Sequence, residues 1–162
     1  MAREMDRRAL LGTAALGGIA WLVFRPTPGE ATARFEVTHS PAEWKRLLGA
    51  ERYRILRDAG TERAFTSPLN EEHRRGTFKC AGCGVPLFSS TTKFESGTGW
   101  PSFYRPLQRA ITTRADHSLL MERTEVLCRR CGGHLGHVFE DGPKPTGLRY
   151  CMNGLALRFQ PA

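Results

Sequence analysis

The chain has 162 residues, of which 40% are hydrophobic and 25% are charged, and its formal net charge is +8. This length suits one domain plus a short extension, and the composition is that of a globular protein rather than a disordered one. Excess positive charge would suit nucleic acid or a membrane surface, but the basic residues occur singly or in pairs and never in a run of five. We therefore predict a solvated basic surface and no nucleic-acid partner.

Residues 1–33 are predicted to be a targeting segment and not part of the fold. Arg7-Arg8, similar to the pair of a twin-arginine signal, precedes an uncharged and mostly apolar run over residues 9–24. Ala31-Thr32-Ala33 has the small-x-small form of a cleavage site. An uncleaved membrane anchor is the alternative, although the run is shorter than the ~20 residues of a spanning helix. We expect residues 34–162 to be exported, either periplasmic or anchored on the outer side of the inner membrane. The leader would meet the export machinery or the membrane itself.

The rest of the chain is predicted to start with a short helical part and to continue as strands. Ser40-Pro41-Ala42-Glu43 is a capping-box pattern, and a second helical stretch over about 51–59 ends at Gly60. Asp116-His117 has the character of a turn between two strands. Strand-forming residues dominate the segments 77–79, 85–95, 111–114, 119–127 and 155–159. The sequence thus predicts a mostly β domain with antiparallel strands.

Two CxxC motifs, Cys80-x-x-Cys83 and Cys128-x-x-Cys131, are separated by 44 residues. Each motif supplies two thiolates from one tight turn, and four thiolates complete a tetrahedral zinc shell, so we predict a structural Zn²⁺ at these cysteines. Two disulfides or a redox-active CxxC are the alternatives. His134 and His137 follow the second motif and offer a competing Cys2His2 assignment. With four thiolates available, we expect both histidines to be free for other work.

Cys151 is the one cysteine outside these pairs. On a strand it would share a face with Arg149 and Asn153, a cation and an amide. A lone cysteine is most often a small buried hydrophobic residue, but a neighbouring cation favours the thiolate, so we predict a nucleophile.

Three motifs carry a resemblance to a known family: CAGCGVPLFSSTTKFESGTGWPSF, CRRCGGHLGHVFEDGP and GLRYCMNG. From about Leu56 to Phe159 the chain resembles the B-type methionine (R)-sulfoxide reductases. The resemblance implies two antiparallel sheets with a zinc knuckle in residues 34–162. It also implies reduction of the R epimer of methionine sulfoxide in proteins, which repairs oxidative damage through a sulfenic acid on Cys151.

The resemblance also implies a substrate pocket, and its chemistry agrees with the residue types. His137, with His134 close by, would protonate the departing oxygen, and Asn153 would hydrogen-bond the sulfoxide. Trp100 would face the methyl group of the substrate, although a simple core role explains it equally well. Arg149 joins Trp100 among the predicted substrate-binding residues.

Thr98 departs from the family pattern, because many members carry a resolving cysteine at this position. The expected reductant is therefore an external thioredoxin-like protein or a small thiol. Two rival interpretations are a zinc-ribbon module that binds nucleic acid and a purely structural envelope protein.

Overall fold

The computed structural model describes residues 35–118 and 122–162. The predicted leader, residues 1–33, lies outside the described residues. Within the described ranges, no helix combines the length and apolar character that crossing a bilayer requires.

Helix α1 (Pro41–Leu56) begins with the predicted capping box. The Ser40 hydroxyl accepts a hydrogen bond from the Glu43 N–H at 3.3 Å, and the Glu43 carboxylate accepts one from the Ser40 N–H at 2.8 Å. The helix is interrupted at Gly49, whose φ of 72° is left-handed, so it consists of two helical pieces as predicted. The second piece ends at Leu56, earlier than the sequence suggested.

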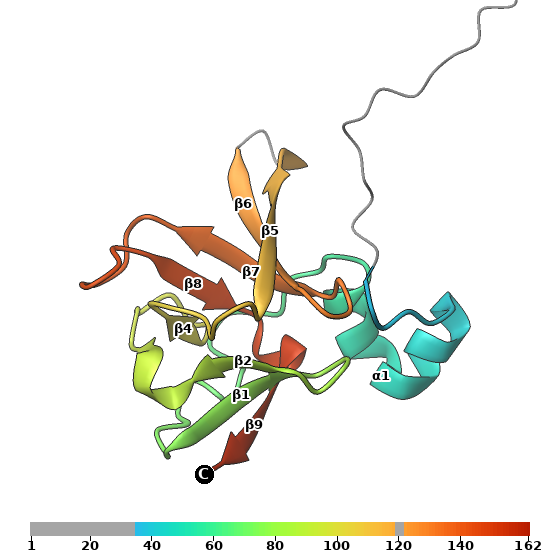
Figure 1. Ribbon diagram of the computed structural model, residues 1–162, viewed down its shortest axis with the longest axis horizontal. Coiled ribbons are helices and arrows are strands. Elements are labelled where there is room, and N and C mark those ends of the chain that lie inside the picture. The colour runs from blue at the N-terminus through green and yellow to red at the C-terminus, as the bar shows by residue number, and fades with distance from the viewer. Residues whose placement is uncertain (1–34, 119–121) are drawn as a thin grey trace, which may run out of the picture. The chain divides into compact units, whose positions relative to one another are not determined.

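The strands of the described residues form two antiparallel sheets (Figure 1). The smaller sheet has the order β2-β1-β9, and the larger has the order β3-β4-β8-β7-β6-β5. The strand bounds are β1 Gly76–Cys80, β2 Pro86–Ser89, β3 Lys93–Phe94, β4 Ser102–Phe103, β5 Ile111–Asp116, β6 Arg123–Cys128, β7 His134–Phe139, β8 Arg149–Met152 and β9 Leu157–Pro161. Two short 3₁₀ helices, η1 (Ser90–Thr92) and η3 (Gly154–Ala156), connect strands.

One detail of the strand prediction is corrected by the structure. Asp116 is the last residue of β5 and pairs with Arg123 at the start of β6, so it belongs to the ladder and not to the turn. Its side chain is therefore fixed by the sheet.

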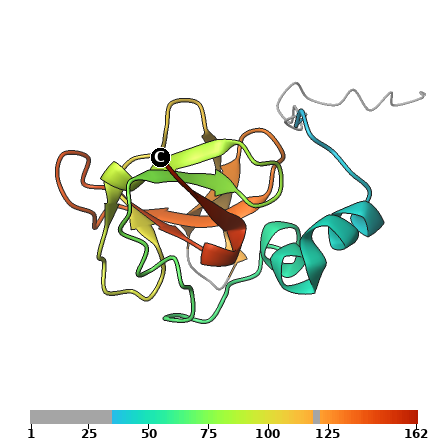
Figure 2. The same cartoon turned by 90° about the horizontal axis from the view of Figure 1, so that it is seen from below.

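The core lies between the two sheets and is rich in phenylalanine. Phe103 on β4 stacks on Phe88 of β2 at 4.4 Å between ring centroids and meets Phe78 of β1 edge-on at 4.9 Å. All three side chains are fully buried. Helix α1 lies to one side of the sheets (Figure 2). The expected fold, mostly β with two antiparallel sheets and a short helical N-terminal part, is confirmed.

Candidate active site

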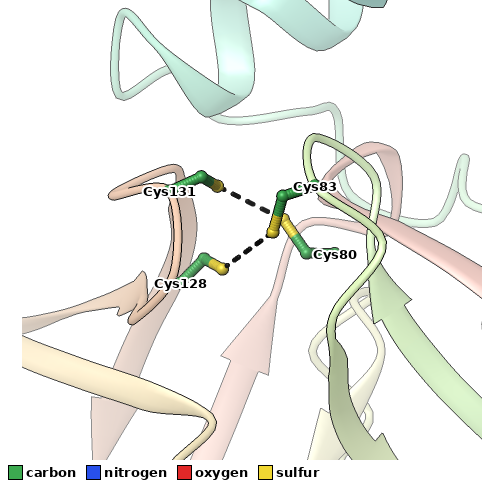
Figure 3. Close-up of side chains that lie close together, drawn as sticks. All are labelled: Cys80, Cys83, Cys128 and Cys131. Atoms are coloured by element: carbon green, nitrogen blue, oxygen red, sulfur yellow. Dashed lines mark hydrogen bonds between the residues drawn. The ribbon is translucent and has the colours of Figure 1, made fainter. Parts of the chain in front are cut away.

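The four paired cysteines converge from two turns. Cys80 and Cys83 come from the turn between β1 and β2, and Cys128 and Cys131 from the turn between β6 and β7 (Figure 3). All four sulfurs lie within 4.8 Å of one another, with Cys80–Cys131 at 3.7 Å and Cys83–Cys128 at 3.6 Å. Tetrahedral Zn–S bonds of about 2.3 Å separate the sulfurs by about 3.8 Å, so the cluster fits zinc. Disulfides would need about 2.05 Å between sulfurs and do not fit.

Both cysteine turns close in the same way. The Gly84 N–H donates to the Cys80 carbonyl, and the Gly132 N–H donates to the Cys128 carbonyl, each at 2.8 Å. Both glycines are left-handed, with φ of 75° and 68°, a conformation that a side chain disfavours. The glycine after each CxxC therefore allows the two thiols of a pair to face one point.

Cys151 lies on β8 between β4 and β7, half-buried. It pairs with His137 on one side and with Ser102 on the other, and directly opposite residues of antiparallel strands share a face. The Thr98 hydroxyl lies 3.7 Å from the Cys151 sulfur. Ser96 joins this hydroxyl to that of Ser102, at 2.8 and 2.7 Å. The thiol therefore sits between a histidine and a chain of hydroxyl groups.

A cavity of about 120 Å³ at Cys151 brings together most of the predicted site residues. Drug-sized ligands occupy about 300–1,000 Å³, so this cavity suits one small side chain. His134 and Arg149 are not among the residues that line it. The walls are formed by Thr61, Trp100, Arg123, Gly136, His137, Phe139, Cys151 and Asn153.

The two histidines reach the same side of β7 because of a β-bulge. Residues three apart on a regular strand point to opposite faces. Here Val126 of β6 pairs with Gly136, whereas the next residue, Leu127, pairs with His134, so β7 contains one extra residue. The bulge brings the rings of His134 and His137 together, with centroids 5.4 Å apart.

His137 is held by a carboxylate that an arginine also binds. Its Nε2 lies 2.8 Å from Asp116 Oδ2, and Arg123 Nη2 donates to the same oxygen at 2.7 Å. Burial lowers the pKa of His137, and the hydrogen bond to Asp116 opposes that shift. Hydrogen bonds with Ser118 and then with His137 hold the pKa of Asp116 well below its ordinary value. Asp116 thus orients the imidazole and stabilises its protonated form.

His134 has a similar partner but a more buried position. Its Nδ1 lies 2.7 Å from Glu125 Oε1, and Arg114 Nε donates to the other carboxylate oxygen at 2.7 Å. Its Nε2 is buried and has no hydrogen-bond partner within the described part of the chain. Because the described metal cluster consists of the four thiols alone, the Cys2His2 alternative is wrong.

The amide of Asn153 is fixed by the backbone of distant segments. Its Oδ1 accepts from the Glu62 N–H at 2.9 Å, and its Nδ2 donates to the Leu135 carbonyl at 3.2 Å. The Trp100 indole N–H donates to the Glu62 carbonyl at 3.2 Å. The buried Glu62 carboxylate in turn accepts from the N–H groups of Gly154 and Leu155. One acidic residue thus positions two walls of the cavity.

Arg149 lies next to the cavity, and its interactions with Asp141 first and also with Cys151 raise its pKa. Its guanidinium binds Asp141 through two hydrogen bonds of 2.8 and 2.7 Å and lies 4.4 Å from the centre of the Phe139 ring. Phe139 lines the cavity, so Arg149 supports a wall, and its expected contact with substrate stays a prediction.

The sequence analysis missed four residues that hold this site together. Glu125 had a readable signal, since it is a carboxylate next to the apolar residues Val126 and Leu127 in a strand. The other three had no local signal, because their partners are far away in the sequence or on another strand. The missed residues are Glu62, Asp116 in its role beside His137, Arg123 and Glu125.

Comparison with known proteins agrees with this geometry. Residues 48–161 match the SelR domain. Peptide methionine sulfoxide reductase MsrB of Leptospira interrogans is 58% identical over 127 residues, which cover 78% of this chain and 97% of that protein. The MsrB proteins of Thiobacillus denitrificans and Methanosarcina barkeri are 58% and 53% identical, over 74% and 79% of this chain and 92% and 91% of theirs. The chain therefore belongs to the MsrB family, the peptide methionine sulfoxide reductases that carry a SelR domain.

Proposed function

We propose that this chain reduces methionine sulfoxide in peptides and proteins, selects the R epimer, and uses Cys151 as its nucleophile. The observation that carries the proposal is the position of Cys151, opposite His137 and in one cavity with Trp100 and Asn153. The names of the relatives support the substrate class. Because each sulfoxide epimer has its own class of reductase, the B-type family supports the R epimer.

The proposed reaction transfers one oxygen atom from the substrate to the enzyme. The Cys151 thiolate attacks the sulfur of the sulfoxide and forms an S–S bond while the oxygen is protonated. The S–S bond and the S–O bond of the substrate then break as the hydroxyl moves to the Cys151 sulfur, where the new S–O bond forms. The substrate sulfur gains two electrons and the cysteine sulfur loses two. The products are methionine and a sulfenic acid on Cys151.

The neighbours of Cys151 have separate roles in this proposal. His137 protonates the sulfoxide oxygen, and Asp116 keeps the imidazole oriented for that step. Asn153 has a second amide hydrogen beyond the one that it gives to Leu135, and with no other partner for it among the described residues, this hydrogen would bind the oxygen. Trp100 supplies an apolar wall for the methyl group. His134 is more buried and binds Glu125, which lies opposite His137 on β6, so it helps to hold the strand that carries His137.

We propose that the four-cysteine cluster holds a structural zinc. The thiolates of Cys80, Cys83, Cys128 and Cys131 would bind it, and the sulfur separations support that metal. Bound zinc supplies folding stability by joining the two sheets. The reaction at Cys151 is carried by other residues.

The residue at position 98 supports an external reductant, because it is threonine and not a resolving cysteine. Its hydroxyl occupies the place beside Cys151 that a resolving thiol would need, and the remaining cysteines form the cluster. A thioredoxin-like protein or a small thiol must therefore attack the sulfenic acid directly.

We also propose that residues 1–33 export the reductase domain, residues 34–162, or anchor it outside the inner membrane. Support comes from Arg7-Arg8 and the apolar run behind it. Lysine at both arginine positions should retain the protein in the cytoplasm if the twin-arginine route is used. Unchanged export in a fractionation experiment would point to the general secretory route or a simple anchor.

The test of the activity is a single turnover without reductant. The protein is mixed with the separate R and S epimers of N-acetyl-methionine sulfoxide methylamide, and the released thioether is quantified. We expect about one equivalent per chain from the R epimer and none from the S epimer. Equal reduction of both epimers would contradict the epimer assignment, and two equivalents per chain would contradict the one-cysteine mechanism.

A further inference from the structure

Phe65 is an exposed aromatic residue next to the cavity of Cys151. It is 73% exposed, and Leu47 on α1, at 47%, is the other large exposed hydrophobic side chain in the described ranges. Its φ of 64° lies in the left-handed region, which a side chain of this size rarely adopts. Residues held in such sparsely populated backbone conformations cluster at active sites and ligand-binding loops.

The conformation of Phe65 is fixed by the loop that carries Thr98 and Trp100. Its N–H donates to the Gly99 carbonyl at 2.8 Å, and the Asn70 amide donates to the same oxygen at 3.1 Å. Gly99 has no room for a side chain, because a Cβ there would lie 2.8 Å from the Phe65 ring. The aromatic ring is therefore presented by a formed surface.

This surface is a groove of about 320 Å³ that continues past the catalytic cavity. Trp100 lines both spaces, so the groove adjoins the cavity at this residue. The groove also contains Phe65, Asn70, Glu71 and Glu95. Its charged lining residues are two carboxylates: Glu71 is 87% exposed and lies 3.7 Å from His73, whereas Glu95 is 67% exposed and is already paired with Lys93 at 3.0 Å.

We propose that this groove binds the polypeptide chain next to the oxidised methionine and favours a basic residue there. The inference rests on the proposed function, since it concerns the substrate of the same site. The cavity at Cys151 has room for one small side chain, so the flanking residues of a peptide must lie outside it. On the side of Trp100 they meet Phe65, which offers an apolar and cation-binding ring, and the exposed carboxylate of Glu71. Phe65 is thus a substrate-positioning residue.

The test compares a short and a long substrate in single turnovers, which need no reductant. The short substrate is N-acetyl-methionine sulfoxide methylamide, and the long ones are seven-residue peptides with the sulfoxide flanked by lysine or by glutamate. The quantity compared is the single-turnover rate constant for the lysine peptide divided by that for the short substrate. In Phe65→Ala this ratio should fall about tenfold, because one aromatic contact is lost. Phe65→Asn checks the backbone, because asparagine tolerates the left-handed conformation and should lower the ratio equally.

Two further variants complete the test. Leu47→Ala removes the other exposed hydrophobic side chain, far along α1, and should leave the ratio unchanged. Glu71→Gln should reduce the preference for the lysine peptide over the glutamate peptide by about threefold at low salt.

An unchanged ratio in both Phe65 variants would overturn the inference. So would a defect that appears only in multiple turnovers with a protein reductant, since that would assign the groove to the reductant. If the wild-type protein reduces none of these substrates, the proposed function itself fails. Reduction of the short substrate with no effect of Phe65 on the ratio rejects the groove alone.

Discussion

The two cysteine sites of this protein contain the same functional group in opposite surroundings. In the cluster, four thiols face one another, and three of them, Cys80, Cys128 and Cys131, are buried. Cys151 is half-buried, touches a hydroxyl and opens into a cavity with an imidazole. Buried thiols that surround a metal are stable, whereas a lone thiol reacts where a small molecule can reach it. The comparison indicates that access and partners, not residue type, separate the proposed zinc ligands from the proposed nucleophile.

The largest expected effect is on the cluster. If zinc is bound as proposed, Cys128→Ser leaves it only three ligands, and structural zinc contributes on the order of 10 kcal/mol to folding. The variant should retain little zinc and should unfold or melt far below the wild type, as measured by metal analysis and thermal denaturation. Cys151→Ser is the matched control and should keep both the metal and the melting temperature. A metal-free Cys128→Ser protein with unchanged melting would remove the zinc assignment.

The second effect concerns the proposed nucleophile, Cys151. Cys151→Ser should lower methionine sulfoxide reduction by about a thousandfold or more, because a hydroxyl is a poor nucleophile towards sulfur. A sulfenic-acid probe should label wild-type protein at Cys151 after one turnover and should not label this variant. Labelling at a cluster cysteine would show that the two sites exchange roles.

A smaller effect is expected from the group beside His137. Burial lowers the pKa of His137 and Asp116 raises it, so Asp116→Asn should lower it further. Activity that needs the imidazolium falls as pH rises through this pKa, so the variant should lose activity at lower pH than the wild type. The decrease at neutral pH should be about tenfold to a hundredfold. The exposed Glu140→Gln is the control, and a pH profile that shifts upward in Asp116→Asn would contradict the role of Asp116.

The smallest effect on rate is expected at Thr98. Its hydroxyl is 3.7 Å from the Cys151 sulfur, so Thr98→Cys places a second thiol within reach of the sulfenic acid. One turnover should then consume two thiols per chain and yield a disulfide, whereas the wild type should consume one and gain an oxygen atom. Thiol titration and intact mass distinguish these products. A disulfide between Cys151 and a native cysteine would be inconsistent with an external reductant.

The sequence predicted those features that depend on neighbouring residues. The capping box at Ser40, the paired thiols and the strand before Cys80 are local patterns, and each is found in the structure. Family resemblance supplied the two-sheet fold. The resemblance also implied a pocket of Trp100, His134, His137 and Asn153 at Cys151, and all of these except His134 line one cavity.

The remaining features depend on contacts between distant segments. The position of His134 beside His137 needs a bulge that no residue pattern indicated. Glu62 bonds to residues more than 90 positions later, so its role is invisible in local sequence. Asp116 looked like a turn residue, yet the β5–β6 ladder extends far enough to hold it against His137.

The positions of the cysteines along the chain have a consequence for the catalytic cavity. Cys83 and Cys128 enclose 44 residues, and a cross-link around a loop of this length removes about 4 kcal/mol of chain entropy from the unfolded state. The enclosed loop carries Thr98, Trp100, Asp116, Arg123 and Glu125. A metal at the cluster would therefore keep Trp100 and the carboxylate partners of both histidines tethered near β8. Slow loss of that metal would let the loop move away from β8, so the cavity would lose its shape although every side chain in it stayed chemically intact.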